Sequence, residues 1–270
     1  MKKLLSLTLV LILSSGFFTG CKKDKGTPPK LPPQESMTID FSNFDGQKKS
    51  ADMTSGLKGT ENSNFEFAAT VAIVWKLIID INIAVPVASF KLAIDQTPVY
   101  LSKNNWQWSY NVPVANVTYK ARLTGEIRAS DIAWKMYITK DGTGGFTDFL
   151  WYEGTSKPDR SGGQWIIHES PQSPAAILQI DWTKTGTSTG TVKYTYVKTD
   201  TFKTGYIEYG LTTNPLNAYY TIHYYNGIKF SDVNVEWNTT THDGRVKSID
   251  YLLGGIWYCW DSNKVNMICP

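Results

Sequence analysis

Apolar and polar residues alternate along most of the chain after Pro98. The clearest stretch is VTYKARLTGEIRA, residues 117–129, where apolar residues hold one parity and charged or hydroxyl residues hold the other. This period of two is typical of a strand with one buried face and one solvent face. Six further segments follow similar rules: DIAWKMYIT (131–139), AILQIDWTK (176–184), TVKYTYVK (191–198), AYYTIHYYN (218–226), DVNVEWN (232–238) and RVKSIDYLL (245–253).

Turn-forming stretches rich in Gly, Asn, Asp and Pro separate these segments, and no helical pattern lies between them. Parallel pairing is therefore excluded, because each parallel crossover needs a dozen or more residues. The fold class we expect is mainly β, a large antiparallel meander of about ten to twelve strands. Since one face is apolar, the sheet must close into a barrel or wrap around a filler. We expect a curved sheet or half-barrel.

Residues 61–90, ENSNFEFAATVAIVWKLIIDINIAVPVASF, admit two readings. Apolar residues fill both parities, and a run longer than twenty residues favours one long buried helix near 62–85 over a strand. Asn62 or Ser63 could cap its start, with Glu66 completing a capping box. Pro86 is expected to end or kink the helix. A membrane span is disfavoured because charged residues interrupt the run, and strand remains the alternative.

The N-terminus has the layout of an export signal. Lys2 and Lys3 precede an apolar run, Leu4 to Leu13, which at about ten residues is too short to span a bilayer. Small residues and then Cys21 follow, so residues 1–26 resemble the signal peptide and lipobox of bacterial lipoproteins. That resemblance implies cleavage after Gly20, acylation of Cys21 and a lipid-anchored location in the cell envelope, at the outer membrane.

Behind Cys21, the charged stretch KKDKG is similar to export tags of Bacteroidetes surface lipoproteins, although those are often acidic. It could equally be a basic linker resting on anionic head groups. Residues 21–36, with four prolines, are expected to be a lipidated cysteine and polyproline tether outside the fold. Residues 37–270 then form a single β-rich domain. The sequence leaves open whether the domain lies on the periplasmic or the surface-exposed face of the membrane.

Charge and cysteines limit the partners. Of 27 basic residues, Lys2 and Lys3 leave with the signal, so 25 face 24 acidic ones, which argues against nucleic acid. If Cys21 is acylated, Cys259 and Cys269 remain and, in an oxidising compartment, favour a disulfide. No histidine lies near them to support a metal site. We therefore expect no metal and no cofactor.

Catalytic constellations are not recognisable. His168, His223 and His242 lie in separate segments, and the Gly-rich stretch at Gly142 reads as a hairpin loop rather than a phosphate cradle. Four glutamates on different expected strands leave a glycosidase pair open, because only their separations could decide it: Glu126, Glu153, Glu208 and Glu236. No residue is assigned as catalytic.

Aromatic residues make up 13% of the chain, an unusual share. Most must fill the core, but some could stack on sugar rings or receive an acyl chain. The candidate ligand-binding residues are Trp106, Trp108, Trp151, Tyr152 and Trp257. Both parities are aromatic at 219–220 and 224–225, which indicates a strand contacted on both faces.

These features favour a non-catalytic, membrane-anchored lipoprotein that binds an apolar or lipid-like ligand. In element order it resembles the half-barrel of lipoprotein-carrier proteins, a curved antiparallel sheet that holds helices in its concavity. That resemblance implies a cavity between helix and sheet. The alternatives are a surface glycan-binding protein, a structural envelope protein and a glycosidase.

Overall fold

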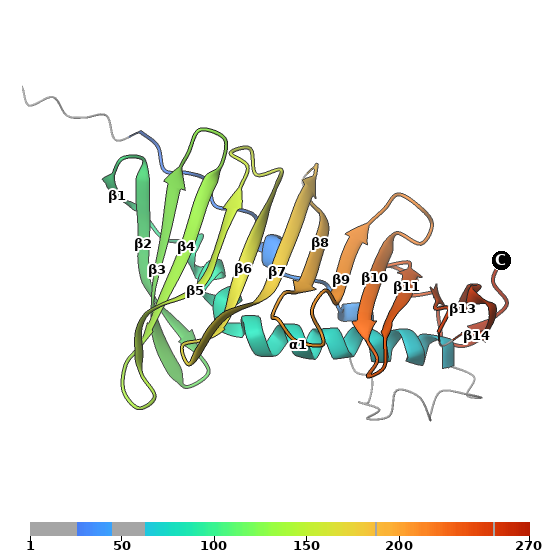
Figure 1. Ribbon diagram of the computed structural model, residues 1–270. Coiled ribbons are helices and arrows are strands. Elements are labelled where there is room, and N and C mark those ends of the chain that lie inside the picture. Colours follow the sequence, from blue (N-terminus) through green and yellow to red (C-terminus); the bar gives the residue numbers. More distant parts are fainter. Residues whose placement is uncertain (1–25, 45–62, 187, 251) are drawn as a thin grey trace, which may run out of the picture.

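The computed structural model describes residues 26–44, 63–186, 188–250 and 252–270 (Figure 1). Within these residues a single sheet of 14 strands is antiparallel throughout, and its strands follow one another in sequence order from β1 to β14. The predicted antiparallel meander is confirmed. The strands are β1 Val99–Ser102, β2 Asn105–Val114, β3 Val117–Ile127, β4 Ile132–Lys140, β5 Phe146–Ser156, β6 Gly162–Ser170, β7 Ser173–Thr185, β8 Ser188–Tyr196, β9 Tyr206–Leu211, β10 Ala218–Tyr225, β11 Phe230–Trp237, β12 Gly244–Lys247, β13 Tyr258–Trp260 and β14 Asn266–Met267.

The strand count exceeds the expected ten to twelve because the sheet ends in very short strands. β1 has 4 residues, β13 has 3 and β14 has 2, too few for alternation to be recognised. The segment 245–253 is also shorter than its pattern suggested, since β12 ends at Lys247. Among the described residues no pairing joins β1 to β14, so the sheet is open. Bulges in the β4–β5, β6–β7 and β7–β8 pairs add twist, which helps an open sheet to curve.

The helix α1 spans Ser63–Ala93, so the described part of the ambiguous run, residues 63–90, is helical and not a strand. It continues past Pro86 to Ala93, where the sequence suggested an end near residue 85. Proline costs a helix one backbone hydrogen bond, but here Pro86, Phe90 and Ala93 are buried against the sheet, which offsets that loss. Asn62 lies outside the described residues.

α1 crosses the strands along one face of the sheet, from β13 and β14 at its start towards β2 and β6 near its end (Figure 1). A buried stripe at helical spacing faces the sheet: Phe65, Ala68, Ala72, Trp75, Ile79, Ile83, Phe90 and Ala93. The opposite side stays apolar yet open to solvent, and Ile81 is 80% exposed. By length and composition α1 could cross a membrane, but only 33% of its most apolar stretch is buried. A core helix passes the same test.

The N-terminal segment, residues 26–44, packs on the same face as α1. This differs from the expected free tether to residue 36, because Pro29, Pro32 and Ser36 are buried. Trp165 donates its indole N–H to the Ser36 hydroxyl across 3.2 Å. Two sheet tyrosines donate their hydroxyl groups to backbone carbonyls of this segment: Tyr194 to the buried Met37 O, and Tyr220 to Asp40 O. The predicted signal peptide and Cys21 lie outside the described residues.

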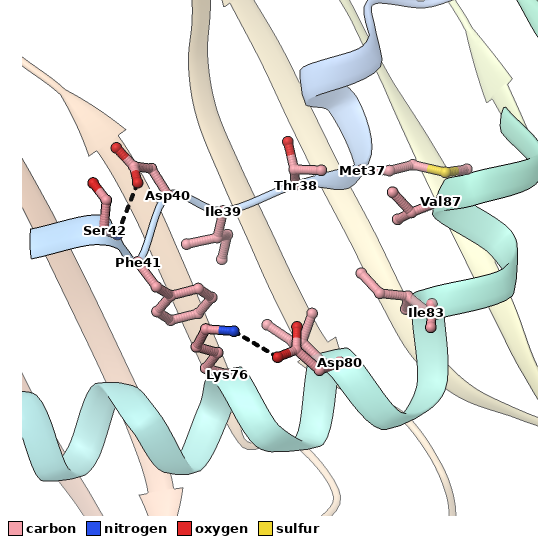
Figure 2. A pocket seen from close by; sticks show the side chains of 12 residues that line it. Met37, Thr38, Ile39, Asp40, Phe41, Ser42, Lys76, Asp80, Ile83 and Val87 are labelled. Carbon is pink, nitrogen blue, oxygen red and sulfur yellow. Dashed lines mark hydrogen bonds and ion pairs between the residues drawn. The ribbon is translucent and has the colours of Figure 1, made fainter. Parts of the chain in front are cut away.

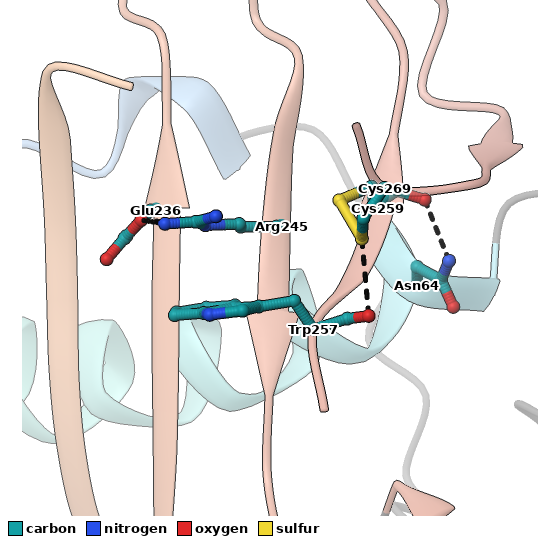
Figure 3. The surroundings of a disulfide bond; sticks show 6 residues. All are labelled: Asn64, Glu236, Arg245, Trp257, Cys259 and Cys269. Carbon is teal, nitrogen blue, oxygen red and sulfur yellow. Dashed lines mark hydrogen bonds and ion pairs between the residues drawn. A yellow bond between two sulfur atoms is a disulfide. The ribbon is translucent and has the colours of Figure 1, made fainter. Parts of the chain in front are cut away.

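Cys259 and Cys269 are joined by a disulfide, as expected (Figure 3). The bond ties the C-terminal tail to β13. From the same hairpin Asn266 bonds to the first turn of α1, accepting from the Asn64 backbone N–H at 3.0 Å and donating to the Ser63 hydroxyl at 3.0 Å. The start of α1 and the C-terminal hairpin are thereby fastened to each other.

Candidate functional site

An apolar cavity of about 390 Å³ lies between the middle of α1 and one end of strands β8–β10. We call it the aromatic cavity. Helix and sheet both line it: Val74, Trp75, Ile78, Ile81, Asn82, Tyr196, Phe202, Gly205, Tyr224 and Tyr225. Its lining is almost wholly apolar or aromatic, and its volume falls in the range of roughly 300–1,000 Å³ seen for small-molecule sites. The arrangement suits an alkyl chain better than a polar ligand.

One wall of the aromatic cavity is the loop between β8 and β9, residues 197–205. Two anchors hold it. Lys198 donates to both carboxylate oxygens of Glu169, at 2.9 and 2.7 Å. Asp200 accepts from the Tyr196 hydroxyl at 2.8 Å and from the Phe202 backbone N–H at 2.9 Å. These bonds fix Phe202, which is 54% exposed, at the rim of the cavity.

Few polar atoms face the aromatic cavity. Trp75 is 3% exposed, and its indole N–H finds no hydrogen-bond partner among the described residues. A buried donor left unpaired costs about 1–3 kcal/mol. The Asn82 amide group donates to Ile78 O at 2.7 Å, and this leaves its side-chain oxygen as an acceptor. Burial raises the pKa of Tyr196, an effect that Asp200 reinforces, so this tyrosine stays neutral.

A second cavity of about 410 Å³ flanks α1 on the side of the N-terminal segment (Figure 2). Met37, Phe41, Ile79 and Ile83 are among its lining residues, but it also holds the ion pair Lys76–Asp80, with 2.6 Å between Nζ and Oδ2. Two neighbouring charges make this second cavity more polar than the aromatic cavity. It is a weaker candidate for an apolar ligand.

The predicted ligand-binding aromatics lie apart from the aromatic cavity. Trp106, Trp108 and Tyr152 are buried: Tyr152 packs against Trp165. Trp151 is half-buried beside Tyr119, Phe146 and Phe149. Trp257 lies at the far end of the sheet, with the Arg245 guanidinium over its ring (Figure 3). The ammonium group of Lys247 also lies 4.8 Å from the ring centroid of Trp257. The structure does not bring these five together, and ligand contact by them stays a prediction.

A signal for the aromatic cavity was present in the sequence. Tyr224 and Tyr225 have opposite parity, which indicated a strand contacted on both faces, and both line the cavity. The cavity's other half comes from residues 74–82, where a helix and a strand were both compatible with the pattern. Only the helical geometry places Val74, Ile78 and Ile81 on one side.

The four glutamates considered for glycoside hydrolysis occupy four non-adjacent strands, β3, β5, β9 and β11. Each has a local partner: Glu126 with Arg128, Glu153 with Lys135, Glu208 with Tyr219 and Glu236 with Arg245. None of them lines either of the two cavities beside α1. The histidines are likewise separate, with His223 beside Asp232, His168 near Glu153 and His242 bonded to Asn43. Among the described residues no group of three potential metal ligands occurs.

Aromatic rings on the other face of β9–β11 stack on one another. His223 and Phe230 are parallel, with centroids 4.6 Å apart, and Tyr206 stacks on His223 at 5.5 Å. Lys193 lies over Tyr206 at 3.8 Å. Because these faces cover each other, they do not form the flat open platform on which a sugar ring stacks.

Comparison with known proteins adds no assignment: no family model, curated protein or solved structure matches this chain. The functional argument therefore rests on the chain's own residues.

Proposed function

We propose that this protein is an exported, membrane-anchored lipoprotein that binds an apolar or lipid-like ligand without transforming it. The aromatic cavity carries the binding part of the proposal. A helix and a sheet enclose it, its walls are apolar, and its volume suits a single alkyl chain. The anchoring part rests on the sequence alone, on the apolar run before Cys21 and the small residues beside it.

The ligand we favour is an amphiphile with one hydrogen-bond-donating group. Apolar walls would take its chain, and burying each CH₂ contributes about 0.8 kcal/mol. The side-chain oxygen of Asn82, whose amide group already donates to Ile78 O, offers an acceptor beside the chain. A hydroxyl or protonated carboxyl group of the ligand would donate to it.

The rival hypotheses find less support in the geometry. A glycan-binding protein needs open aromatic faces, whereas the outer rings cover one another. A glycosidase needs two free carboxylates in one cleft, whereas the four candidate glutamates are paired on separate strands. A structural envelope protein needs no cavity, so ligand binding separates that hypothesis from ours.

Binding can be tested with a fluorescent fatty acid and the purified protein. Ile78→Trp places an indole in the aromatic cavity and is expected to abolish binding of the probe. Leu77→Trp makes the same substitution one position along, at a residue that does not line the cavity, and is expected to bind like the wild type. Native mass spectrometry of freshly purified protein should also show a lipid that Ile78→Trp lacks.

Equal binding by both variants would contradict the location of the site. Failure of the wild type to bind the probe, together with absence of any co-purified lipid, would contradict the binding function itself. Intact mass measurement of the protein extracted from membranes tests the anchor separately, because acylation of Cys21 adds a defined mass.

A further inference from the structure

The described chain begins at one edge of the sheet. Pro29 lies beside Gly125 and Trp134 near the end of β3, and residues 28–34 line a cleft with Trp108 and Arg160. The turns at this edge connect alternate strand pairs, namely residues 103–104, 128–131 and 157–161. We call these turns the N-terminal edge. In Figure 1 the blue start of the described chain lies beside them.

Basic side chains outnumber acidic ones at the N-terminal edge. Residues 28–34, the three turns and the end of β3 carry five basic residues against three acidic ones: Lys30, Lys103, Arg128, Lys157 and Arg160 against Glu126, Asp131 and Asp159. The guanidinium group of Arg128 lies 3.5 Å from the Glu126 carboxylate and 3.8 Å from the Asp131 carboxylate. Both distances are longer than those of a charge-assisted hydrogen bond. Asp159 accepts from the Ser161 backbone N–H at 2.9 Å. Lys103 and Lys157 are exposed.

We propose that the N-terminal edge rests on the anionic head groups of the membrane that holds the protein. This inference rests on the proposed acylation of Cys21. Only residues 22–25 separate that cysteine from Gly26, and the five steps between these two Cα atoms reach at most about 17 Å when fully extended. The edge therefore stays near the bilayer surface, where each basic side chain contributes about fivefold to binding.

The same orientation directs the aromatic cavity away from that bilayer. The loop 197–205 and the turn 226–229, which follow β8 and β10, lie at the opposite ends of the strands from the N-terminal edge (Figure 1). Ligand exchange would then occur on the side remote from the anchoring membrane. A probe in loop 197–205 reports on this directly.

The experiment uses the full-length lipidated protein in phosphatidylcholine vesicles with or without phosphatidylglycerol. Ser130→Cys and Thr201→Cys each introduce a thiol for a fluorophore, at the N-terminal edge and in loop 197–205 respectively. A head-group quencher should reduce the fluorescence at residue 130 in anionic vesicles but leave residue 201 unaffected. High salt should weaken the quenching, because it screens the attraction.

Charge reversal supplies the matched comparison. Lys103→Glu with Lys157→Glu should abolish quenching at residue 130, while Lys120→Glu with Lys203→Glu, the same charge change near the opposite edge, should preserve it. Equal quenching at residues 130 and 201, or quenching that survives the first pair of substitutions, overturns the orientation. A protein that leaves the vesicles entirely in high salt overturns the anchoring, and the orientation with it.

Discussion

Asn266 caps the start of α1 from a position 202 residues away in the chain: its side-chain oxygen accepts a hydrogen bond from the Asn64 backbone N–H at 3.0 Å. The side-chain amide group of Asn64 in turn donates a hydrogen bond to Cys259 O, in the same hairpin, at 2.8 Å. The helix that fills the sheet is therefore fastened at its beginning by the last hairpin of the chain. The disulfide between Cys259 and Cys269 holds that hairpin together.

Replacing Asn266 by alanine should lower the free energy of unfolding by about 1 kcal/mol, the usual effect of losing a helix cap. Urea unfolding followed by tryptophan fluorescence measures the change. Asn263→Ala is the control, since Asn263 lies exposed in the same hairpin and, among the described residues, bonds only through its backbone N–H. Equal losses in the two variants would contradict the cap.

Replacing both Cys259 and Cys269 by serine should destabilise the protein by about 2–3 kcal/mol, because a loop with a sequence separation of 10 is no longer closed in the unfolded chain. The midpoint of urea unfolding measures this. In the same background Asn266→Ala should cost less than in the wild type, since its hairpin is already loosened. Strict additivity of the two effects would contradict the coupling between disulfide and cap.

Tyr194→Phe should destabilise the protein by about 1–3 kcal/mol, because it leaves the buried carbonyl of Met37 without its donor. Limited proteolysis should then cut within residues 26–44 sooner than in the wild type. Tyr209→Phe is the control: Tyr209 is half-buried against the same core, and no hydrogen bond of its hydroxyl is found within the described residues. Unchanged proteolysis in Tyr194→Phe would show that this bond does not hold the N-terminal segment.

Acid should open the loop 197–205. Hydrogen bonds from Lys198 first and Ser173 second hold the pKa of Glu169 below its ordinary value of 4.5, while desolvation and, more weakly, nearby Asp200 oppose the shift. A lowered pKa means that the stabilisation is fully present above the ordinary value and is lost as pH falls through the folded value. The affinity for the fluorescent fatty acid should therefore fall as pH drops below about 4.5. Equilibrium binding titrations at a series of pH values across this range measure it.

Glu169→Gln separates this effect from general acid unfolding. The variant should show weaker probe binding near neutral pH and a flatter decline in acid, because it has no carboxylate to protonate. Far-ultraviolet circular dichroism at each pH monitors the sheet. Wild type and variant declining in parallel would assign the acid response to other groups.

The strands of this protein are determined locally. In β3 the buried positions Ala121, Leu123 and Gly125 follow the alternation visible in the sequence, because each strand buries one face regardless of its neighbours. The disulfide partners could also be assigned from the sequence, since setting Cys21 aside leaves one pair. Such features depend on residue type and spacing alone.

The end of α1, the path of residues 26–44 and the aromatic cavity depend on contacts between distant segments. Pro86 stays helical because the sheet buries it, and the proline-rich segment packs because Trp165 and Tyr194 reach its polar groups. The cavity exists only where α1 crosses strands β8–β10. Local pattern thus determined the antiparallel meander, while tertiary burial and long-range hydrogen bonds decided what fills its face and where space remains.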